Sequence, residues 1–178
     1  PAADTSETET VRKKSTRKAV KRSGLAKGLI DVKSEVSKPE FPQAAFELAG
    51  GNLPLYYPSV RLAEGGYTTT DGVRAYEIVS RTKKRYAAFR LSLYYGENGQ
   101  YYGVQGTSWR NPPILAEQHR TITRSGRKLE LYGAPGGRYR LIAWKTPRGV
   151  YWVSNTISNR LSNAQMLDIA SNLRRVPG

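Results

Sequence analysis

The sequence predicts an α+β domain: an antiparallel sheet of about six or seven strands, a C-terminal helix packed on it and a flexible basic N-terminal tail. From Gly66 onward, runs rich in aromatic and β-branched residues alternate with short turn sequences, as in successive hairpins. The last part changes to a helical repeat of apolar residues, and the first 40 residues are polar and rich in charge.

Residues 1–40 are predicted to be a linker or tail, largely disordered or with one short helix, and residues 41–178 to be the folded domain. The helix is suggested by Leu25, Leu29, Val32 and Val36, which recur at helical spacing. The stretch before it carries many cations and no acid, so it is predicted to contact a polyanion through Arg12, Lys13, Lys14, Arg17, Lys18, Lys21 and Arg22.

The domain is predicted to begin with a short helical turn in "FPQAAFELAGG", followed by extended chain in "NLPLYYPSV", where Pro54 and Pro58 disfavour helix before them. Five turn sequences then separate the strands: a two-residue hairpin at Asp71-Gly72, and the turns "GENG", "RSGR", "APGG" and "TPRG". In "TPRG", Pro147 and Gly149 occupy the positions that a type I turn prefers.

The closing helix is predicted from its start signals. Ser162 and Gln165 have the spacing of a capping box, and Leu161 and Met166 have that of a hydrophobic staple. The stretch of serines and asparagines at 154–163 is therefore interpreted as a strand end, a turn and a cap, with a binding loop as the alternative.

The helix is predicted to continue to Leu173, because Met166, Ile169, Ala170 and Leu173 follow its repeat. Arg174 and Arg175 would then face the negative end of the helix dipole, and Asp168 would lie on the polar side.

Composition restricts the chemistry. There are no cysteines, which excludes disulfides and thiolate sites, and the net charge of +15 favours nucleic acid, anionic lipid headgroups or phosphate-bearing polymers as partners. No apolar run approaches the roughly 18 residues of a membrane span. A first residue of Pro1 suggests a processed or excised chain.

Catalytic signals are weak. The only histidine, His119, lies in a polar stretch and is interpreted as a solvated residue, and no carboxylate pair or metal-ligand spacing is present. "GAPGGRYR" lacks the end of a phosphate-binding loop and is read as a turn. The sequence therefore predicts no catalytic residue, metal or cofactor.

Aromatic residues around the "GENG" turn form the main candidate surface. Alternating residues of a strand face opposite sides, so half of these rings are expected in the core and half on a binding platform. The ligand-binding candidates are Arg90, Tyr94, Tyr95, Tyr101, Tyr102, Trp109 and Arg110. A second basic group, at Lys83, Lys84 and Arg85, is a further polyanion candidate, with a solvated hairpin loop as the alternative.

Three segments carry a resemblance to a known family: "LPLYYPSV", "YYGVQGTSWRNPPIL" and "RLIAWKTPRGVYWVSNTISNRLSNAQMLDIA". They resemble the C-terminal extracytoplasmic extension of some actinobacterial LytR–CpsA–Psr proteins, over roughly residues 24–176. Members of that family are membrane-anchored, face outward and attach phosphate-linked glycopolymers to the cell wall. The resemblance implies an envelope location, a tether in a missing N-terminal segment and an upstream catalytic domain of the parent chain as partner.

Three functions remain open from the sequence. The first is a non-catalytic accessory module that contacts an anionic cell-wall glycopolymer or membrane surface. The second is a basic nucleic-acid-binding protein, although no recognition motif is present. The third is an enzyme with an uncommon constellation that includes His119. Oligomeric state is not determined by the sequence.

Overall fold

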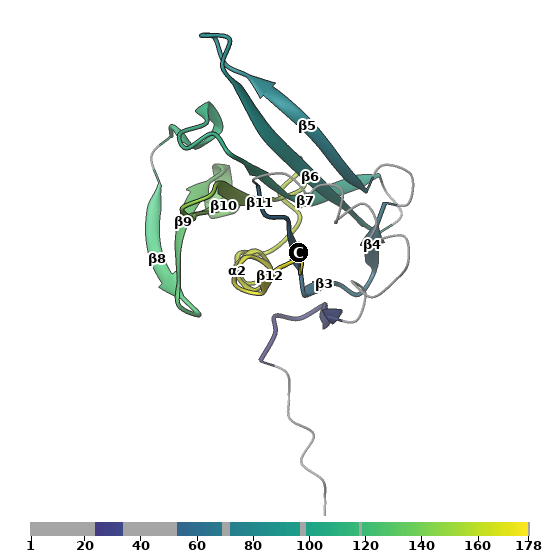
Figure 1. The fold of residues 1–178 in the computed structure, drawn as a ribbon. Helices are drawn as coiled ribbons and strands as arrows, with labels where there is room; N and C mark the ends of the chain where they lie inside the picture. The colour runs from purple at the N-terminus through teal and green to yellow at the C-terminus, as the bar shows by residue number, and fades with distance from the viewer. Residues whose placement is uncertain (1–23, 34–52, 69–71, 97–98, 118, 178) are drawn as a thin grey trace, which may run out of the picture.

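The computed structural model describes residues 24–33, 53–68, 72–96, 99–117 and 119–177. Its main element is an eight-stranded antiparallel sheet that curves around one helix (Figure 1). The strands are β4 (Gly65–Tyr67), β5 (Val73–Val79), β6 (Arg85–Tyr95), β7 (Gln100–Thr107), β8 (Arg120–Arg124), β9 (Arg127–Gly133), β10 (Tyr139–Lys145) and β11 (Val150–Ser154). The predicted α+β class is confirmed, with a slightly larger sheet than expected because the short β4 adds to it.

The sheet has the order β4-β6-β7-β11-β10-β9-β8, with β5 also paired to β6. The prediction of a hairpin around Asp71-Gly72 is wrong as a strand pairing, because β4 and β5 pair with different parts of β6 and not with each other. At 11 residues, β6 is long enough to hold both short strands along one edge.

Local turn chemistry explains the hairpins that were predicted correctly. Ser125 and Gly126 link β8 to β9 with φ values of 50° and 71°, the left-handed backbone that a two-residue hairpin turn requires. Thr146 and Gly149 close the β10–β11 turn, where the Thr146 N–H donates to the Gly149 carbonyl at 2.9 Å. A 3₁₀ turn, η3 (Pro135–Gly137), joins β9 to β10.

The inner, concave face of the sheet packs on α2 (Asn163–Ser171), and the two form the main core. The outer face has a smaller core under η2 (Pro113–Leu115), with Leu115 packed among residues of β9, β10 and β11. β10 and β11 are therefore buried on both faces, while β4, β5 and β8 lie at the edges of the sheet.

The capping box of α2 is confirmed. The Gln165 N–H donates to the Ser162 hydroxyl, and the Ser162 N–H donates to the Gln165 side chain at 2.8 Å. Leu161 and Met166, the predicted staple, are both fully buried in the main core.

The helix ends earlier than the sequence predicts. Asn172 caps it, and the next three residues form a strand, β12 (Leu173–Arg175), paired with β2 (Tyr56–Pro58). Arg174 and Arg175 therefore belong to a strand and do not extend the last helical turn. Strand pairing with β2 outweighs the helical repeat that Leu173 continues.

The predicted helix at the end of the tail is a strand. β1 (Leu29–Asp31) pairs with β3 (Val60–Leu62), and Leu29 and Val32 are buried. Residues 24–33 are thus packed on the domain, although the sequence places them in the tail. Residues 1–23, which hold the basic run, and the predicted turn at 41–51 lie outside the described residues.

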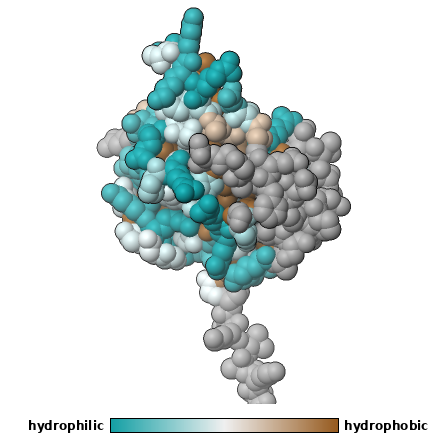
Figure 2. Space-filling view, viewed as in Figure 1, coloured by the Kyte–Doolittle hydropathy of each residue, from teal (hydrophilic) through white to brown (hydrophobic). Residues whose placement is uncertain are grey.

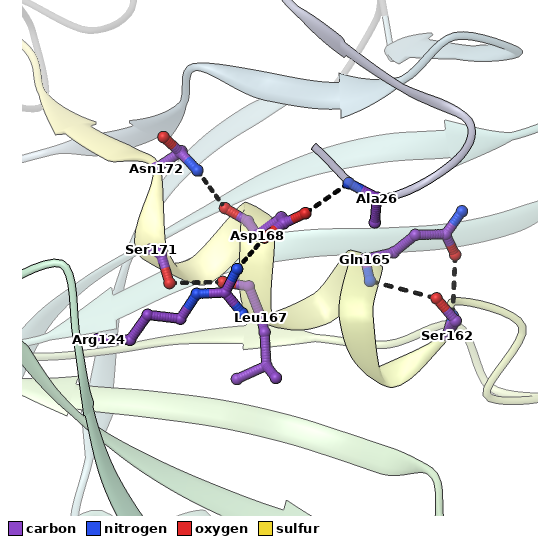
Figure 3. A network of polar contacts seen from close by, with 8 residues as sticks. All are labelled: Ala26, Arg124, Ser162, Gln165, Leu167, Asp168, Ser171 and Asn172. Carbon is purple, nitrogen blue, oxygen red and sulfur yellow. Dashed lines mark hydrogen bonds and ion pairs between the residues drawn. The ribbon is translucent and has the colours of Figure 1, made fainter. Parts of the chain in front are cut away.

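Asp168 holds this N-terminal segment to the helix (Figure 3). Its carboxylate accepts the Ala26 N–H at 2.6 Å and pairs with Arg124 from the end of β8. Beside it, the Gln165 amide donates to the Lys27 carbonyl at 2.9 Å. The expectation that Asp168 lies on a polar surface is wrong, since only 4% of the residue is exposed.

Candidate functional site

The outer face of β5, β6 and β7 brings together aromatic and cationic side chains. Strand register sets Arg74 opposite Arg90 and Arg90 opposite Gln105. Four residues further along β6, it sets Tyr94 opposite Tyr101. Alternation along β5 adds Tyr76 to the same face as Arg74. We call this surface the outer platform; it consists of Arg74, Tyr76, Arg90, Tyr94, Tyr101 and Gln105.

A shallow depression lies in the outer platform. It has a volume of about 580 Å³ and is lined by Arg74, Ala75, Tyr76, Arg90 and Gln105. Between the arginine row and the Tyr94–Tyr101 row, the register places Ser92 opposite Gly103. These two residues have small or absent side chains; Gly103 is buried and Ser92 is half-buried.

The three platform tyrosines are unusually exposed. Tyr76 and Tyr94 are 41% exposed and Tyr101 is 49% exposed, whereas Phe89 and Tyr102 on the inner face of β6 and β7 are buried. Exposed tyrosines offer a flat apolar face and a hydroxyl at once, which suits sugar rings and bases.

Gly66 of β4 helps to position one of these rings. A Cβ atom at Gly66 would lie 3.0 Å from Cε1 of Tyr94, so the ring packs directly over the glycine backbone. Absence of a side chain at Gly66 thus lets Tyr94 rest against the sheet.

The outer platform is electropositive. Arg74 and Arg90 lie directly opposite each other, an arrangement of like charges that disfavours the sheet. Among the described residues, Arg90 forms no ion pair or hydrogen bond, so its guanidinium remains available to an external anion. Partial burial raises the pKa of Tyr76 above its usual value, while nearby Arg90 lowers it, and Tyr76 therefore stays neutral at physiological pH.

The remaining predicted ligand-binding residues lie elsewhere. Tyr102 is 1% exposed and its hydroxyl accepts the Leu62 N–H, while Tyr95 packs against the same inner core. Trp109 stacks on Tyr86 near the far end of β6, and Arg110 donates to the carbonyls of the β10–β11 turn. The prediction that adjacent tyrosines face opposite sides is confirmed: Tyr102 is buried, and the half-buried Tyr95 packs against the inner core and not on the outer face.

Three platform residues were missed by sequence analysis: Arg74, Tyr76 and Gln105. They become neighbours of Arg90 only through the registers of β5 with β6 and of β6 with β7. The signal was present in "VRAYEIV", whose alternating pattern places Arg74 and Tyr76 on one face of a strand.

Lys83, Lys84 and Arg85 lie at the tip of the β5–β6 hairpin and are exposed. The tip is a tight turn, in which the Ser80 N–H donates to the Lys84 carbonyl at 2.8 Å. Hydrophilic side chains cover the hairpin that projects from the body of the molecule (Figure 2). The predicted basic contacts of the tail, from Arg12 to Arg22, lie outside the described residues.

His119 lies beside a small group of polar residues on the outer face. Its ring contacts Tyr132 at 4.9 Å, and Nε2 is 3.9 Å from a Glu130 carboxylate oxygen. That carboxylate also pairs with Lys145 at 3.1 Å and accepts the Tyr132 hydroxyl at 2.9 Å. Desolvation, with the neighbouring Glu130, raises the pKa of Tyr132 well above 10, so its hydroxyl remains a donor.

The serines and asparagines at 154–163 do not join His119. Asn155 donates to the Tyr139 and Leu161 carbonyls and accepts the N–H groups of Thr156 and Leu161. The Asn163 side chain binds the backbone of Tyr139 and Gly137. These contacts fix the chain between β11 and α2, as the architectural interpretation predicts.

A second depression, of about 650 Å³, lies where the β8–β9 and β10–β11 turns approach Tyr56. Two of its cations are already engaged: Arg127 donates to the Ala170 and Leu173 carbonyls and lies 5.0 Å over the Trp144 ring, and Lys145 pairs with Glu130. Arg127 thereby joins α2 and β12 to the sheet.

Comparison of the chain with protein-family models, curated proteins and solved structures gives no match. Within the described part of the chain, no group of three or more histidine or acidic side chains is arranged to hold a metal ion. In the same residues, no helix has the length and apolar character needed to cross a bilayer.

Proposed function

We propose that this chain is a non-catalytic accessory module of a cell-envelope protein and that it binds an anionic glycopolymer through the outer platform. The observation that carries the proposal is the exposed Tyr94–Tyr101 pair, on one face with the unpaired Arg90. Stacking on tyrosine holds the sugar rings, and the guanidinium binds the phosphate groups between them.

The geometry suits an extended polymer more than a small ligand. The platform runs across three strands, is open to solvent and has no deep enclosed part, whereas small-molecule sites bury most of their ligand. An open surface of this kind gains affinity from repeated weak contacts along a chain. The resemblance to LytR–CpsA–Psr extensions supports a wall glycopolymer as the polyanion and an upstream catalytic domain as the partner that acts on it.

Binding of the full chain to a purified phosphodiester-containing wall glycopolymer, measured by isothermal titration calorimetry at roughly 150 mM salt, tests the proposal. Arg90→Gln and Tyr101→Ser are each expected to weaken binding about five- to tenfold, which corresponds to roughly 1 to 1.4 kcal/mol. Arg138→Gln is the matched control, because Arg138 is also exposed but follows η3 and is not part of the outer platform.

Unchanged affinity in both platform variants would refute the platform as the binding surface. A single-stranded DNA of equal charge serves as the competing ligand in the same titration. Tighter binding of DNA, with a base preference that persists at this salt concentration, would replace the glycopolymer by nucleic acid.

A further inference from the structure

The tip of the β5–β6 hairpin extends away from the sheet and the helix (Figure 1). Its turn is closed by two backbone hydrogen bonds between Ser80 and residues 83 and 84, with Lys83 in the left-handed conformation at φ 62°. Ladder pairing of Val79 with Arg85 and of Ile78 with Tyr86 continues directly below the turn. The tip is therefore a projection whose backbone is held by hydrogen bonds.

Cations dominate this projection. Arg81, Lys83, Lys84 and Arg85 are exposed within five consecutive residues, and the nearest acid, Glu77, already pairs with Arg85 at 2.6 Å. Among the described residues, Arg81, Lys83 and Lys84 form no ion pair. Three exposed cations thus lie on one tight turn, an arrangement that attracts a dense negative surface.

An aromatic and apolar layer lies just behind the cations. The Lys84 ammonium is 5.4 Å from the Tyr86 ring centre, and Tyr86 stacks on Trp109 with ring centres 4.8 Å apart and planes at 6°. Val79, on the facing strand, is 54% exposed. Val79 lies on the same face of the hairpin as Arg85, and the tyrosine–tryptophan stack lies on the opposite face. An aromatic stack beside lysine matches the boundary between lipid headgroups and acyl chains.

We propose that this hairpin tip docks on an anionic phospholipid surface, with its cations among the headgroups and Trp109 at the interfacial level. Attraction of Lys and Arg to anionic lipid brings the tip to the surface, and Val79 and the aromatic stack add apolar contact. The cations of the tip are not residues of the outer platform, so the proposal does not depend on the proposed function. Tyr86 lies on the same face of β6 as Arg90, so the docked tip borders the outer platform.

Tryptophan fluorescence provides a selective test, because the chain has three tryptophans and only Trp109 is not buried. Trp144 and Trp152 are 2% and 3% exposed. The full chain is mixed with vesicles of phosphatidylglycerol and phosphatidylcholine that carry bromine near the headgroup end of the acyl chains. With these vesicles, quenching and a blue shift of the Trp109 fluorescence are expected. With vesicles of equally brominated phosphatidylcholine alone, neither change is expected.

The variant that tests the tip is Arg81→Ser, Lys83→Asn and Lys84→Ser together; asparagine tolerates the left-handed conformation at position 83. It is expected to lose the quenching and to bind vesicles at least tenfold more weakly. The matched control removes three exposed cations elsewhere, by Arg138→Ser, Arg148→Ser and Arg160→Ser, and is expected to keep the quenching. Circular dichroism verifies that both variants are folded. Val79→Ser is a second, milder test, in which partial loss of the Trp109 quenching is expected.

Two results would overturn the proposal. The first is vesicle binding of the full chain without quenching of Trp109, which would assign binding to another basic part, such as residues 12–22. The second is equal loss of binding in the tip and control variants, which would show that net charge alone decides. A loss of vesicle binding in Arg90→Gln or Tyr101→Ser would also contradict the separation of the two surfaces.

Discussion

At the scale of single residues, Asp168 shows how one buried charge is satisfied. Its carboxylate is removed from water, which is costly for an isolated ion, and it gains the Ala26 N–H and the Arg124 guanidinium in return. The two partners come from segments far apart in the chain, Ala26 being 142 positions away. Asp168 therefore joins the N-terminal segment, the end of β8 and α2 at one point.

Asp168→Asn is expected to lower the free energy of unfolding by about 2 to 3 kcal/mol, because it leaves the partly buried Arg124 without its counter-charge. Urea denaturation followed by fluorescence measures the change. Glu117→Gln is the control, since the Glu117–Arg140 pair is exposed and is expected to contribute less than about 1 kcal/mol. Equal effects of the two changes would show that Asp168 has no special role.

At the scale of elements, close packing in the middle of the sheet depends on β7. Gly106 lies where Phe89 of β6 and Tyr151 of β11 approach each other, and a Cβ there would come within 2.5 Å of both rings. Glycine at this position lets the two aromatic rings fill the inner face.

Gly106→Ala is expected to destabilise the domain by about 1 to 3 kcal/mol through overpacking. Gly133→Ala is the matched control, since Gly133 ends β9 with no atom near its missing Cβ, and it is expected to be neutral or slightly stabilising. Thermal unfolding of the two variants compares them directly. A neutral Gly106→Ala would mean that the core around Phe89 is looser than the structure shows.

The cap of α2 makes a separate prediction for that element. Ser162→Ala removes the acceptor for the Gln165 N–H and is expected to cost about 1 kcal/mol. The exposed Ser158→Ala, in the preceding turn, is the control and is expected to change stability by less than about 0.5 kcal/mol. Equal urea midpoints for both variants would show that the cap contributes nothing.

At the scale of the whole molecule, buried tyrosines make stability depend on alkaline pH. Burial raises the pKa of Tyr151 well above its ordinary value of 10.0. Above pH 10 the unfolded chain loses this proton and the folded chain keeps it, so stability falls as pH rises, by about 1.4 kcal/mol per pH unit for one such group.

Tyr151→Phe removes that titration. The free energy of unfolding is measured for both proteins by urea denaturation between pH 9 and 11. Above pH 10 it is expected to fall less steeply in the variant, and the two slopes are expected to differ by about 1.4 kcal/mol per pH unit. Parallel curves for the two proteins would contradict a raised pKa at Tyr151.

The parts of the fold that depend on neighbouring residues were predictable. The capping box of α2 and the left-handed Ser125-Gly126 turn follow from a few adjacent side chains. Pairings between distant segments were not predictable. β1 forms because β3, which includes Leu62, offers it a strand edge, and Arg174 belongs to a strand because β2 offers an edge to β12.

The candidate site likewise has one part that local sequence predicts and another that depends on distant pairings. Alternation along β6 and β7 correctly separates exposed Tyr101 from buried Tyr102. Arg74 and Tyr76 join the platform only through the register of β5 on β6, which no local pattern specifies. The outer platform therefore depends on an arrangement across strands.

A titration of the ¹⁵N-labelled full chain with phosphodiester-containing wall glycopolymer, followed by amide chemical shifts at roughly 150 mM salt, tests the central claim most directly. Binding at the outer platform predicts shifts concentrated on β5, β6 and β7, with the largest around Arg90, Tyr94 and Tyr101. Shifts confined to the basic residues 12–22, with the amides of these strands unchanged, would contradict it.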